Sequence, residues 1–530
     1  MQSEPYSSGL PLLTAACLLG AVRSDDVFTS SAHIERLVDD ELAAMRGLTA
    51  FVRLESRRLE TLRLELERIV AAKATRPVAK SILKNPVDMF KTIKHINKDW
   101  ASIRQELRDT KPFDVYKAVV ELLGRFPTEV DIEGSISGLI SLQDTYSIDA
   151  TQLADGNISG LQLSTYKLDA NDCFDIGTSM MQQKEHYHAL SWLQESWRRH
   201  KKNGDKLDDP QALLVKLSQA YLRQYNPEWA AHAANELLKL SPDLETAAAA
   251  KRMIRSKPGL LDNPLPPVIN ERDNDALRDA YRKMCTQEPQ LTKERLHYCY
   301  YKMDTPYLRL APFKVQILHV DPLLAIFYGV VSDSEIEVFK NISFQGLERA
   351  TVFDPKTRMR YESPIRTSKL KSLTEDAHPV VARLTKRMEA MTGLTMQTAD
   401  NVQLHVSNYG LGGSNLRHLD CALVYSTPFN DRNVGNRIAT LLFYLSEPEA
   451  GGATAFSNLN KVGNAMFWYN LRRSGECDYS TLHAGCPVLA GSKWLLNKWI
   501  YEGGQERRRP CGTQPDAYER FVGHLQSPPP

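Results

Sequence analysis

One short segment of the chain combines two residue types that bind transition metals, His418 and Asp420, with a single residue between them. On an extended strand, residues i and i+2 point to the same side, so this imidazole and this carboxylate can hold one metal ion together. His483, just before a predicted strand, is the best candidate for a third ligand. Two histidines and one carboxylate form the facial triad of non-haem iron(II) oxygenases, which leaves open positions for cosubstrate and dioxygen.

A His-x-Asp triplet alone occurs often by chance, and a downstream lysine adds weight to the iron interpretation. Lys493 follows His483 in the chain and begins an apolar run that predicts a strand. Because a buried lysine needs an anionic partner, the distal carboxylate of 2-oxoglutarate would suit it. A lysine at the strand edge that reaches solvent is the alternative on the residues alone.

The composition indicates a folded protein of several domains with balanced charge. The chain has 530 residues, 42% of them hydrophobic, and 66 lysine and arginine residues stand against 64 aspartate and glutamate residues. This length suggests about three or four domains. A net charge near +2 argues against a dedicated nucleic-acid binder, which normally carries a strong basic excess. No apolar run reaches the ~20 residues needed to cross a bilayer, so we expect no membrane span.

Several features predict a chain that enters the secretory pathway. Residues 1–24 have the character of a signal peptide. The Asn-x-Ser sequons at Asn157 and Asn341 fit a glycoprotein of a luminal compartment. Apart from Cys17 in the predicted leader, the cysteines show no zinc-site spacing, so disulfides in an oxidising lumen are their better use.

Residues 25–165 have the period of amphipathic helices. Apolar residues between Val38 and Ile69 recur at threes and fours, and the second half of this run has the spacing of a coiled-coil seam. We therefore expect a helical dimerisation region here. A single helix that packs on its own domain is the alternative.

Residues 166–257 contain two related helical pairs. An aromatic-x-Ala element repeats at Tyr187 and Trp229, which is typical of a tetratricopeptide-like unit. Tyr221 and Tyr225 lie at positions i and i+4, so on one helix they would share a face. We expect Tyr187, Tyr221 and Tyr225 to line a groove that binds proline-rich peptides, which are stiff and already extended. The alternative is that these tyrosines belong to the core of the repeat.

Beyond a linker at residues 258–315, the sequence of residues 316–530 changes period. Short runs of strand type alternate with glycine pairs, and a helix is expected from Val380 to Met391. Many short strands joined by turns predict a double-stranded β-helix, or jelly roll. The chain is thus expected to be an α+β multidomain protein, with two helical regions followed by the jelly-roll domain that carries the metal site.

Further short stretches surround the metal and lysine positions in a specific pattern. They are Asn408-Tyr409-Gly410, Gly435-Asn436-Arg437-Ile438-Ala439-Thr440, Ala450-Gly451-Gly452-Ala453-Thr454, Phe467-Trp468-Tyr469-Asn470-Leu471, Asp478-Tyr479-Ser480-Thr481, Cys486-Pro487-Val488-Leu489, Asn497-Lys498-Trp499 and Arg509-Pro510-Cys511. With these stretches, the run from Val402 to Cys511 resembles the catalytic domain of the collagen prolyl 4-hydroxylase alpha-subunit family. The resemblance extends upstream through the tetratricopeptide-like region and is weakest in the N-terminal helices.

This resemblance implies an iron(II)- and 2-oxoglutarate-dependent dioxygenase that hydroxylates prolines in collagen-like X-Pro-Gly peptides, a collagen modification that uses O2 and L-ascorbate (vitamin C). His418, Asp420 and His483 would bind Fe(2+). Lys493 would bind the C5 carboxylate of 2-oxoglutarate. The other implied site residues are Tyr409 and Thr440, which would help to bind the cosubstrate, and Arg437 and Trp499, which would lie near the substrate.

The resemblance also implies cysteine pairs, a partner and a compartment. The paired cysteines of the family map to Cys285–Cys299 and to Cys486–Cys511. Alpha subunits of this family assemble with protein disulfide isomerase, the beta subunit, in alpha2beta2 tetramers. That partner retains them in the lumen of the endoplasmic reticulum.

The chain departs from the family pattern at two places close to the chemistry. Asn415, Leu416 and Arg417 stand where Tyr-Glu-Pro usually precedes the first iron histidine, and Tyr501 stands in place of a histidine that assists 2-oxoglutarate binding. Neither change removes a metal ligand, so we expect activity with weaker cosubstrate use or an altered peptide preference.

Two other functions compete with a prolyl hydroxylase. A non-catalytic peptide-binding or assembly subunit would suit the tetratricopeptide-like unit and the altered pocket, but the retained metal ligands and Lys493 speak against it. A dioxygenase for lysyl or other luminal substrates is the third possibility. The resemblance of the middle domain to a proline-peptide-binding domain speaks against that one.

Overall fold

In the computed structural model, the chain divides into two units, each of which is described by itself. One contains residues 1–27 and 33–128, and the other contains residues 28–32 and 129–530. The structure describes residues 26–74, 100–106, 111–158, 161–162, 167–241, 252, 259, 261, 264–272, 275–286, 298–354, 357, 359–363, 365–396, 403–423, 434–456, 459–460 and 465–514. The predicted signal peptide, residues 1–24, lies outside this part of the chain. Among the helices described, none is long and apolar enough to cross a membrane.

The first unit is built on one long helix. Helix α1 runs from Ser31 to Ala74, and helices α4 (Ala101–Glu106) and α5 (Lys111–Leu123) follow it in the chain. A close approach of α5 to α1 requires Gly47, because a Cβ atom there would lie 2.7 Å from Val119. Any larger residue at position 47 would push α5 away.

A stripe of apolar side chains along α1 is exposed. Its members recur mostly at threes and fours: Val38, Leu42, Met45, Leu48, Val52, Leu59 and Leu66. A helix of a soluble protein normally covers such a stripe with its own core or with a partner. The stripe therefore makes α1 suitable for association with another helix.

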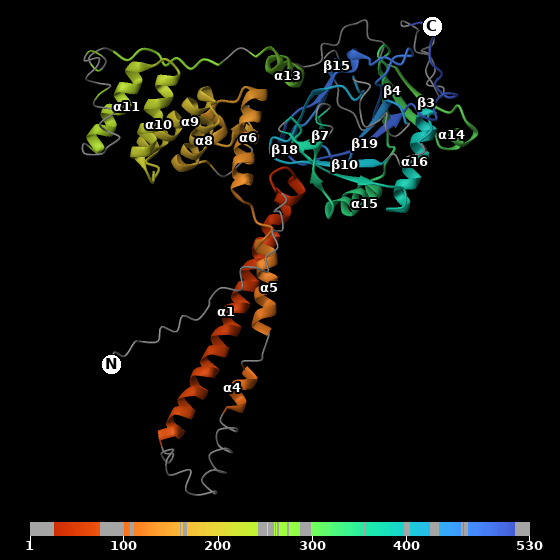
Figure 1. The fold of residues 1–530 in the computed structure, drawn as a ribbon. Helices are drawn as coiled ribbons and strands as arrows, with labels where there is room; N and C mark the ends of the chain where they lie inside the picture. Colours follow the sequence, from red (N-terminus) through yellow and green to blue (C-terminus); the bar gives the residue numbers. More distant parts are fainter. Residues whose placement is uncertain are drawn as a thin grey trace, which may run out of the picture. The chain divides into compact units, whose positions relative to one another are not determined.

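The second unit begins with a helical domain. Its helices are α6 (Glu129–Tyr146), α7 (Ala150–Ala154), α8 (Ala170–Gln182), α9 (His186–Arg198), α10 (Pro210–Arg223) and α11 (Pro227–Leu240). Helices α8 and α9 pack as one pair and α10 and α11 as the next (Figure 1). Ala189 and Ala231 of the repeated aromatic-x-Ala elements are fully buried. A Cβ atom at Gly177 of α8 would lie 2.7 Å from Leu193 of α9, so the two helices meet closely.

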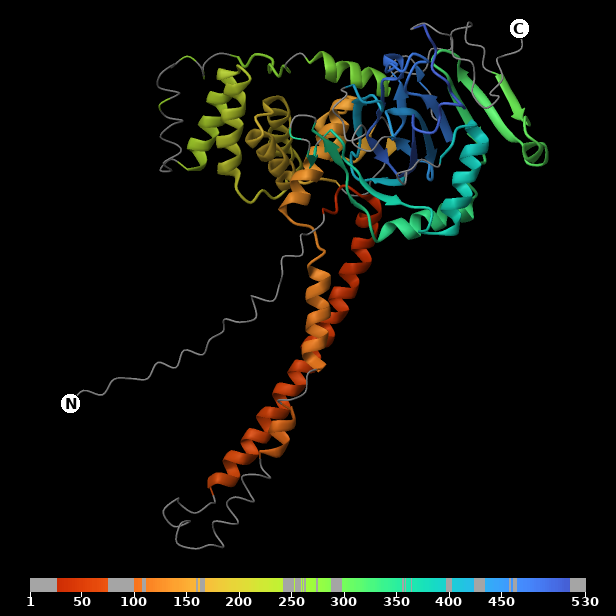
Figure 2. The same ribbon diagram turned by 45° about the vertical axis from the view of Figure 1, so that its right-hand side comes forward.

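The C-terminal domain contains two larger antiparallel sheets (Figure 2). The nine-stranded sheet has, in order, β3 (Tyr298–Lys302), β4 (Phe313–His319), β5 (Leu324–Tyr328), β16 (Ala465–Tyr469), β12 (Arg437–Tyr444), β19 (Lys493–Tyr501), β10 (Leu404–Tyr409), β9 (Lys369–Leu373) and β6 (Glu348–Arg349). The four-stranded sheet has β11 (Asn415–His418), β17 (His483–Gly485), β14 (Thr454–Phe456) and β15 (Leu459–Asn460). The short strand pairs are β1 (Asn157–Ile158) with β2 (Leu161–Gln162), β7 (Thr351–Phe353) with β8 (Arg360–Glu362), and β13 (Ala450–Gly451) with β18 (Val488–Ala490).

The two faces of the nine-stranded sheet have different neighbours. Helices α15 (Asp333–Phe344) and α16 (Pro379–Thr392) share one core cluster with side chains of this sheet, including Leu496 of β19. The next residue toward the N-terminus, Leu495, belongs instead to a cluster with Phe456 of the four-stranded sheet. This alternation follows from the period of a strand. It directs the odd-numbered positions of β19 towards the four-stranded sheet. Together with the helical domains that precede it, this strand-rich domain confirms the expected fold class.

Residues 28–32, which belong to the second unit, pack beside β10. The hydroxyl Oγ of Ser30 donates to Oδ1 of Asn408 at 2.8 Å, in a buried hydrogen bond. The approach is so close that a Cβ atom at Gly410 would lie 1.9 Å from the carbonyl oxygen of Phe28. A residue with a side chain at position 410 is therefore incompatible with this arrangement.

The cysteine pairing differs from the expected one. Cys285 is bonded to Cys486 with a Cα–Cα distance of 5.7 Å, and Cys421 is bonded to Cys477 with a Cα–Cα distance of 5.9 Å. Among the cysteines that the structure describes, Cys173, Cys299 and Cys511 are free. The expected pairs Cys285–Cys299 and Cys486–Cys511 are therefore wrong.

The position of helix α13 (Ala276–Thr286) explains this correction. The hydroxyl of Tyr281 on α13 donates to the carbonyl of Gly485 at 3.2 Å, which holds the helix against the end of β17. One turn later, Cys285 meets Cys486, the residue after β17. Cys299 and Cys511 are both exposed. The packing of α13 against β17 thus pairs Cys285 with a cysteine 201 residues away, and not with Cys299.

Candidate active site

Two adjacent strands of the four-stranded sheet bring the predicted metal ligands together. In the pairing of β11 with β17, His418 lies opposite His483, and their ring centroids are 4.3 Å apart. Asp420 follows β11, with carboxylate oxygens 3.6 Å from Nε2 of His418 and 3.8 Å from Nε2 of His483. One potential ligand atom from each of the three residues lies within 4.8 Å of the others. The three side chains can therefore hold one metal ion.

Hydrogen bonds fix the orientation of both rings. Nδ1 of His418 lies 2.7 Å from the carbonyl of Leu416, and Nδ1 of His483 lies 2.9 Å from the carbonyl of Thr481. A carbonyl can only accept, so each Nδ1 carries the proton and each Nε2 keeps its lone pair for a metal.

A buried chain of hydrogen bonds orients the carboxylate. Nδ2 of Asn470 donates to the hydroxyl of Thr440 at 2.9 Å, and this hydroxyl donates to Oδ2 of Asp420 at 2.7 Å. Burial and the neighbouring His483 lower the pKa of His418 to about 4. Burial alone would raise the pKa of Asp420, but both histidines and Arg437 hold it below its usual range. Near neutral pH, His418 is therefore a neutral imidazole and Asp420 a carboxylate, the protonation states in which these two groups bind a divalent metal.

The ligands open into a cavity of about 1070 Å³. It is lined by all of the catalytic-domain residues singled out from the sequence: His418, Asp420, His483, Lys493, Tyr409, Thr440, Arg437 and Trp499. The odd-numbered residues of β19 and of β10 form much of the wall, as the period of a strand requires. The volume suits a small cosubstrate together with part of a peptide.

Lys493 enters this cavity as a buried cation. Its side chain is fully buried, and within the described part of the chain its Nζ has no hydrogen-bond partner. The nearest groups include the rings of Tyr409 and Tyr444, whose centroids lie 4.7 Å and 5.9 Å from Nζ. Burial lowers the pKa of Lys493 to about 7. A buried amine of this kind requires an anionic partner, and the distal carboxylate of 2-oxoglutarate fits that requirement.

Arg437 and Trp499 form a second polar part of the wall. The guanidinium of Arg437 stacks 3.6 Å from the ring centroid of Trp499, and its Nη1 donates to the carbonyl of Asp420 at 3.3 Å. His405 also contacts this pair, with its ring centroid 4.9 Å from that of Trp499. Burial and the nearby Arg366 and Arg437 lower the pKa of His405 to about 3, so this ring is neutral.

Sequence reasoning missed several residues of the cavity. His405 and Arg366 both line it, and Asn470 holds Thr440. His405 could have been found, because it shares the face of β10 with Tyr409. Arg366 lies in an irregular segment that bridges to Asn415, and no local pattern in the sequence indicates its position.

The two departures from the family pattern both fall at this site. Nδ2 of Asn415 lies 3.2 Å from Nε2 of His418, the nitrogen available to a metal. Tyr501 lies opposite Arg437 in the pairing of β12 with β19, and it lines the cavity. Neither change displaces a candidate ligand.

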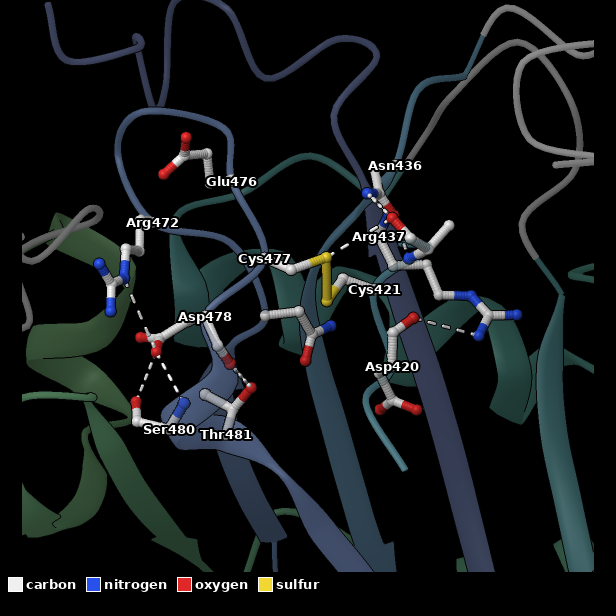
Figure 3. The surroundings of a disulfide bond; sticks show 12 residues. Asp420, Cys421, Asn436, Arg437, Arg472, Glu476, Cys477, Asp478, Ser480 and Thr481 are labelled. Atoms are coloured by element: carbon white, nitrogen blue, oxygen red, sulfur yellow. Dashed lines mark hydrogen bonds and ion pairs between the residues drawn. A yellow bond between two sulfur atoms is a disulfide. The ribbon is translucent and has the colours of Figure 1, made fainter. Parts of the chain in front are cut away.

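The disulfide Cys421–Cys477 cross-links the two segments that carry the ligands (Figure 3). Cys421 directly follows Asp420. Cys477 precedes the 3-10 helix η4 (Tyr479–Thr481), which leads to His483. Asn436 adds a second clamp, because its side chain accepts from the amide of Ala422 at 2.8 Å and donates to the carbonyl at 3.0 Å. The disulfide Cys421–Cys477 therefore limits how far Asp420 and His483 can separate.

We expect the double substitution Cys421→Ala/Cys477→Ala to weaken metal binding by up to about tenfold, the lower range for a group that orients a ligand. Thermal unfolding should also occur at a lower temperature, because a disulfide contributes about 2–4 kcal/mol. Co(II) titration and calorimetry would measure both effects. Cys299→Ala and Cys511→Ala are matched controls at free, exposed cysteines. Wild-type cobalt affinity in the double variant would contradict a positioning role.

The structure separates the three tyrosines of the helical domain. Tyr221 is only 5% exposed, and it accepts a hydrogen bond from Gln194 and stacks on Trp229. Tyr225 is 83% exposed and has a φ of 59°. Helix α10 ends at Arg223, so Tyr221 and Tyr225 are not on one helix face, and that interpretation is wrong. Tyr187 is partly buried on α9.

Comparison with protein families gives three matches along the chain. Residues 30–160 match the prolyl 4-hydroxylase alpha-subunit N-terminal region. Residues 170–256 match the prolyl 4-hydroxylase peptide-substrate-binding domain, and residues 404–501 match the 2OG-Fe(II) oxygenase superfamily. This last match spans the three candidate metal ligands and Lys493. The chemistry implied by that superfamily is therefore that of Fe(2+), 2-oxoglutarate and O2.

Individual proteins extend the likeness over the whole chain. Among solved structures, the viral collagen prolyl hydroxylase of Paramecium bursaria Chlorella virus-1, in its 2OG complex, is 25% identical over 33% of this chain and 92% of its own, with a TM-score of 0.25. Prolyl 4-hydroxylase subunit alpha-3 of Homo sapiens is 33% identical over 94% of this chain and 96% of its own. Subunit alpha-2 of Caenorhabditis elegans is 37% identical over 96% of this chain and 97% of its own. Such identity over nearly the full length of both chains shows that this chain belongs to the prolyl 4-hydroxylase alpha-subunit family.

Proposed function

We propose that this chain is the catalytic alpha subunit of a procollagen-proline 4-dioxygenase, which hydroxylates prolines of X-Pro-Gly sequences with Fe(2+), 2-oxoglutarate and O2. The observation that carries this proposal is the shared cavity of His418, Asp420, His483 and the buried Lys493. A metal-binding triad beside a buried amine that has no hydrogen-bond partner among the described residues suits a divalent metal and a dicarboxylate cosubstrate together.

Each side chain has a distinct task in this proposal. His418, Asp420 and His483 bind the iron, which with 2-oxoglutarate and O2 supplies the oxidising chemistry. Lys493 binds the C5 carboxylate of 2-oxoglutarate, with Tyr409 beside it. The hydroxyl of Thr440 holds Asp420 in position while the buried strands exclude water.

The substrate peptide is proposed to enter beside Arg437 and Trp499. Their stacked side chains have polar groups in the cavity wall, and within the described residues Nε1 of Trp499 has no hydrogen-bond partner. A peptide could pack against these two partly exposed side chains. The wall would then orient the proline ring towards the metal.

Away from the catalytic domain, we propose separate roles for the two helical regions. Residues 25–165 form a dimerisation region, supported by the exposed apolar stripe of α1. Residues 166–257 bind proline-rich peptides, with Tyr187, Tyr221 and Tyr225 as candidates, supported by the match to a peptide-substrate-binding domain. Residues 258–315 would link them to the dioxygenase domain at 316–530, and the end of this range, with β3 and the start of β4, pairs into the sheet of that domain. A substrate held on the helical domain would reach the iron at a raised local concentration.

The proposed compartment is the lumen of the endoplasmic reticulum, with residues 1–24 as signal peptide. The two disulfides require an oxidising compartment. Asn157 and Asn341, the proposed glycosylation sites, are both exposed. The proposed partner is protein disulfide isomerase in an alpha2beta2 tetramer, and L-ascorbate would restore iron that is oxidised in uncoupled turnover.

Turnover of 2-oxoglutarate tests the proposal and its alternatives. With the chain co-expressed with protein disulfide isomerase, we expect (Pro-Pro-Gly) repeat peptides to increase succinate release and to acquire hydroxyproline. A lysine-containing repeat peptide is the matched control and should do neither. A non-catalytic assembly subunit would bind the peptide without succinate release, and a lysyl hydroxylase would respond to the control peptide instead.

A further inference from the structure

The segment at residues 264–272 lies against the helical domain and binds it as a separate peptide would. In both views it runs without helix or strand from the side of α11 towards α13 (Figures 1 and 2). Its first four residues, Pro264-Leu265-Pro266-Pro267, are exposed and rich in proline. Such a sequence favours the polyproline II conformation.

Asn226, between α10 and α11, binds the backbone of the segment twice. Nδ2 of Asn226 donates to the carbonyl of Ile269 at 2.6 Å, and Oδ1 accepts from the amide of Ile269 at 2.6 Å. Asn226 is 2% exposed, whereas Ile269 is 45% exposed. The amide side chain thus binds the backbone of position 269 and not its side chain, so many extended peptides could bind in the same way.

A second backbone contact lies three residues earlier. Nε1 of Trp229 donates to the carbonyl of Pro266 at 2.8 Å, and the indole stacks on the ring of Tyr221 at 5.7 Å. In polyproline II, which has three residues per turn, the carbonyls of positions 266 and 269 would point to the same side. An indole N–H that donates to a proline-rich backbone is also how aromatic surfaces bind such peptides.

The far end of the segment is held by side chains. Nδ2 of Asn270 donates to the carbonyl of Tyr187 at 3.1 Å and to Oγ of Ser191 at 2.9 Å. Arg272 forms a two-bond ion pair with Asp144 of α6, and its guanidinium lies 5.5 Å from the ring centroid of Tyr187. The segment therefore contacts Tyr187 and, through Trp229, the stacked Tyr221–Trp229 pair. Tyr187 and Tyr221 are two of the three candidate peptide-binding residues.

We propose that residues 264–272 are an intramolecular ligand of this surface, defined by Tyr187, Ser191, Asn226 and Trp229. A collagen-like peptide binds to the same surface by displacing residues 264–272. The inference rests on the proposed peptide binding by the helical domain and adds a competitor built into the chain. The amide of Ile269 donates to Asn226, so a displacing peptide needs an N–H at this position. The glycine of a Pro-Pro-Gly repeat supplies one, whereas a proline has none.

Competition of this kind reduces the apparent affinity for peptide. If the segment covers the surface for nine-tenths of the time, the apparent Kd is about tenfold above the intrinsic Kd. Loosening the segment without changing the surface should therefore tighten peptide binding. A segment that only supports the domain would have the opposite effect, because its loss would disturb the surface.

The test uses the full chain, without iron, and measures the Kd of fluorescent (Pro-Pro-Gly)5 by anisotropy. The variant Asn270→Ala/Arg272→Ala removes the side-chain anchors from the segment and leaves the surface residues unchanged. Pro266→Gly/Pro267→Gly is a second variant, which loosens the segment through backbone freedom and keeps the Arg272–Asp144 ion pair. We expect a decrease in Kd of about 3- to 10-fold in both variants.

Leu265→Ser is the matched control, at an exposed position of the same segment, and its Kd should equal that of the wild type. An unchanged Kd in both loosened variants, or a higher one, would overturn the displacement and leave peptide binding by the domain intact. If neither the wild type nor any variant bound the peptide, both the displacement and the peptide-binding role would be overturned.

Discussion

Replacing Asp420 by asparagine should abolish both metal binding and 2-oxoglutarate turnover, with a loss of metal affinity of at least about 100-fold. Loss of a residue that only orients a metal ligand lowers metal affinity by up to about 100-fold. Because Asp420 is itself a candidate ligand, its replacement should cost at least this much. Asparagine has nearly the same shape and can still accept from Thr440, so the change removes mainly the negative charge. The metal would then meet two neutral imidazoles and one neutral amide.

Cobalt titration and succinate release would measure the two losses, and calorimetry of the metal-free variant would report the fold. Because the shape and the hydrogen bond are preserved, the metal-free variant should unfold close to the wild-type temperature. Asp333→Asn, at an exposed position of α15, is the matched control and should retain full metal affinity. Wild-type cobalt affinity in Asp420→Asn would exclude this carboxylate as a ligand.

Replacing Lys493 by methionine should raise the Kd of 2-oxoglutarate roughly 100- to 5000-fold while cobalt binding remains. Removal of one partner from a buried ion pair costs about 3–5 kcal/mol, which corresponds to this range. Methionine fills a similar volume without the charge. The matched control is Lys498→Met, because Lys498 is also buried on β19 but does not line the cavity.

The pH dependence gives the Lys493 assignment a second signature. Burial lowers the pKa of Lys493 to about 7, so above pH 7 the free enzyme must take up a proton to bind the carboxylate. The Kd of 2-oxoglutarate should then rise with pH, by up to tenfold per unit, in the wild type and not in Lys493→Met.

Although Lys493→Met should weaken cosubstrate binding, it should increase the free energy of unfolding of the cosubstrate-free chain. A lysine whose folded pKa is lowered destabilises the cosubstrate-free fold below its unfolded pKa, and this penalty grows as pH falls towards 7. Lys493→Met should therefore stabilise the free chain, most of all at pH 7 and below. A lysine with a purely structural role would give the reverse result on unfolding.

The candidate metal site follows from patterns of short range in the sequence. The spacing of His418 and Asp420 is set within one segment, and the strand expected to begin at Lys493 is found at Lys493–Tyr501. The expected helix from Val380 to Met391 is found at Pro379–Thr392 for the same reason, since its period is local. Only the register of β11 with β17, however, places His483 opposite His418.

Contacts of long range were not predictable in this way. The partner of Cys285 lies 201 residues away and is chosen by the packing of α13 on β17. The prediction that Tyr221 and Tyr225 share a helix face was wrong, although one residue of the sequence already argued against it. Pro227 disfavours helix in the residue before it, so α10 had to end ahead of Asn226. That break frees Asn226 to bind the backbone of the linker.

The N-terminal residues 28–32 have a consequence for the order of synthesis. Ser31 and Ala32, at the start of α1, bond to Asn408, and the hydroxyls of Ser31 and Ser492 lie 2.7 Å apart. The ribosome makes residues 28–32 well before it makes β10 and β19. Residues 28–32 therefore cannot form these hydrogen bonds until β10 and β19 have been made. A tag or fusion placed just ahead of Phe28 should hinder this late closure, whereas one placed after residue 514 should not.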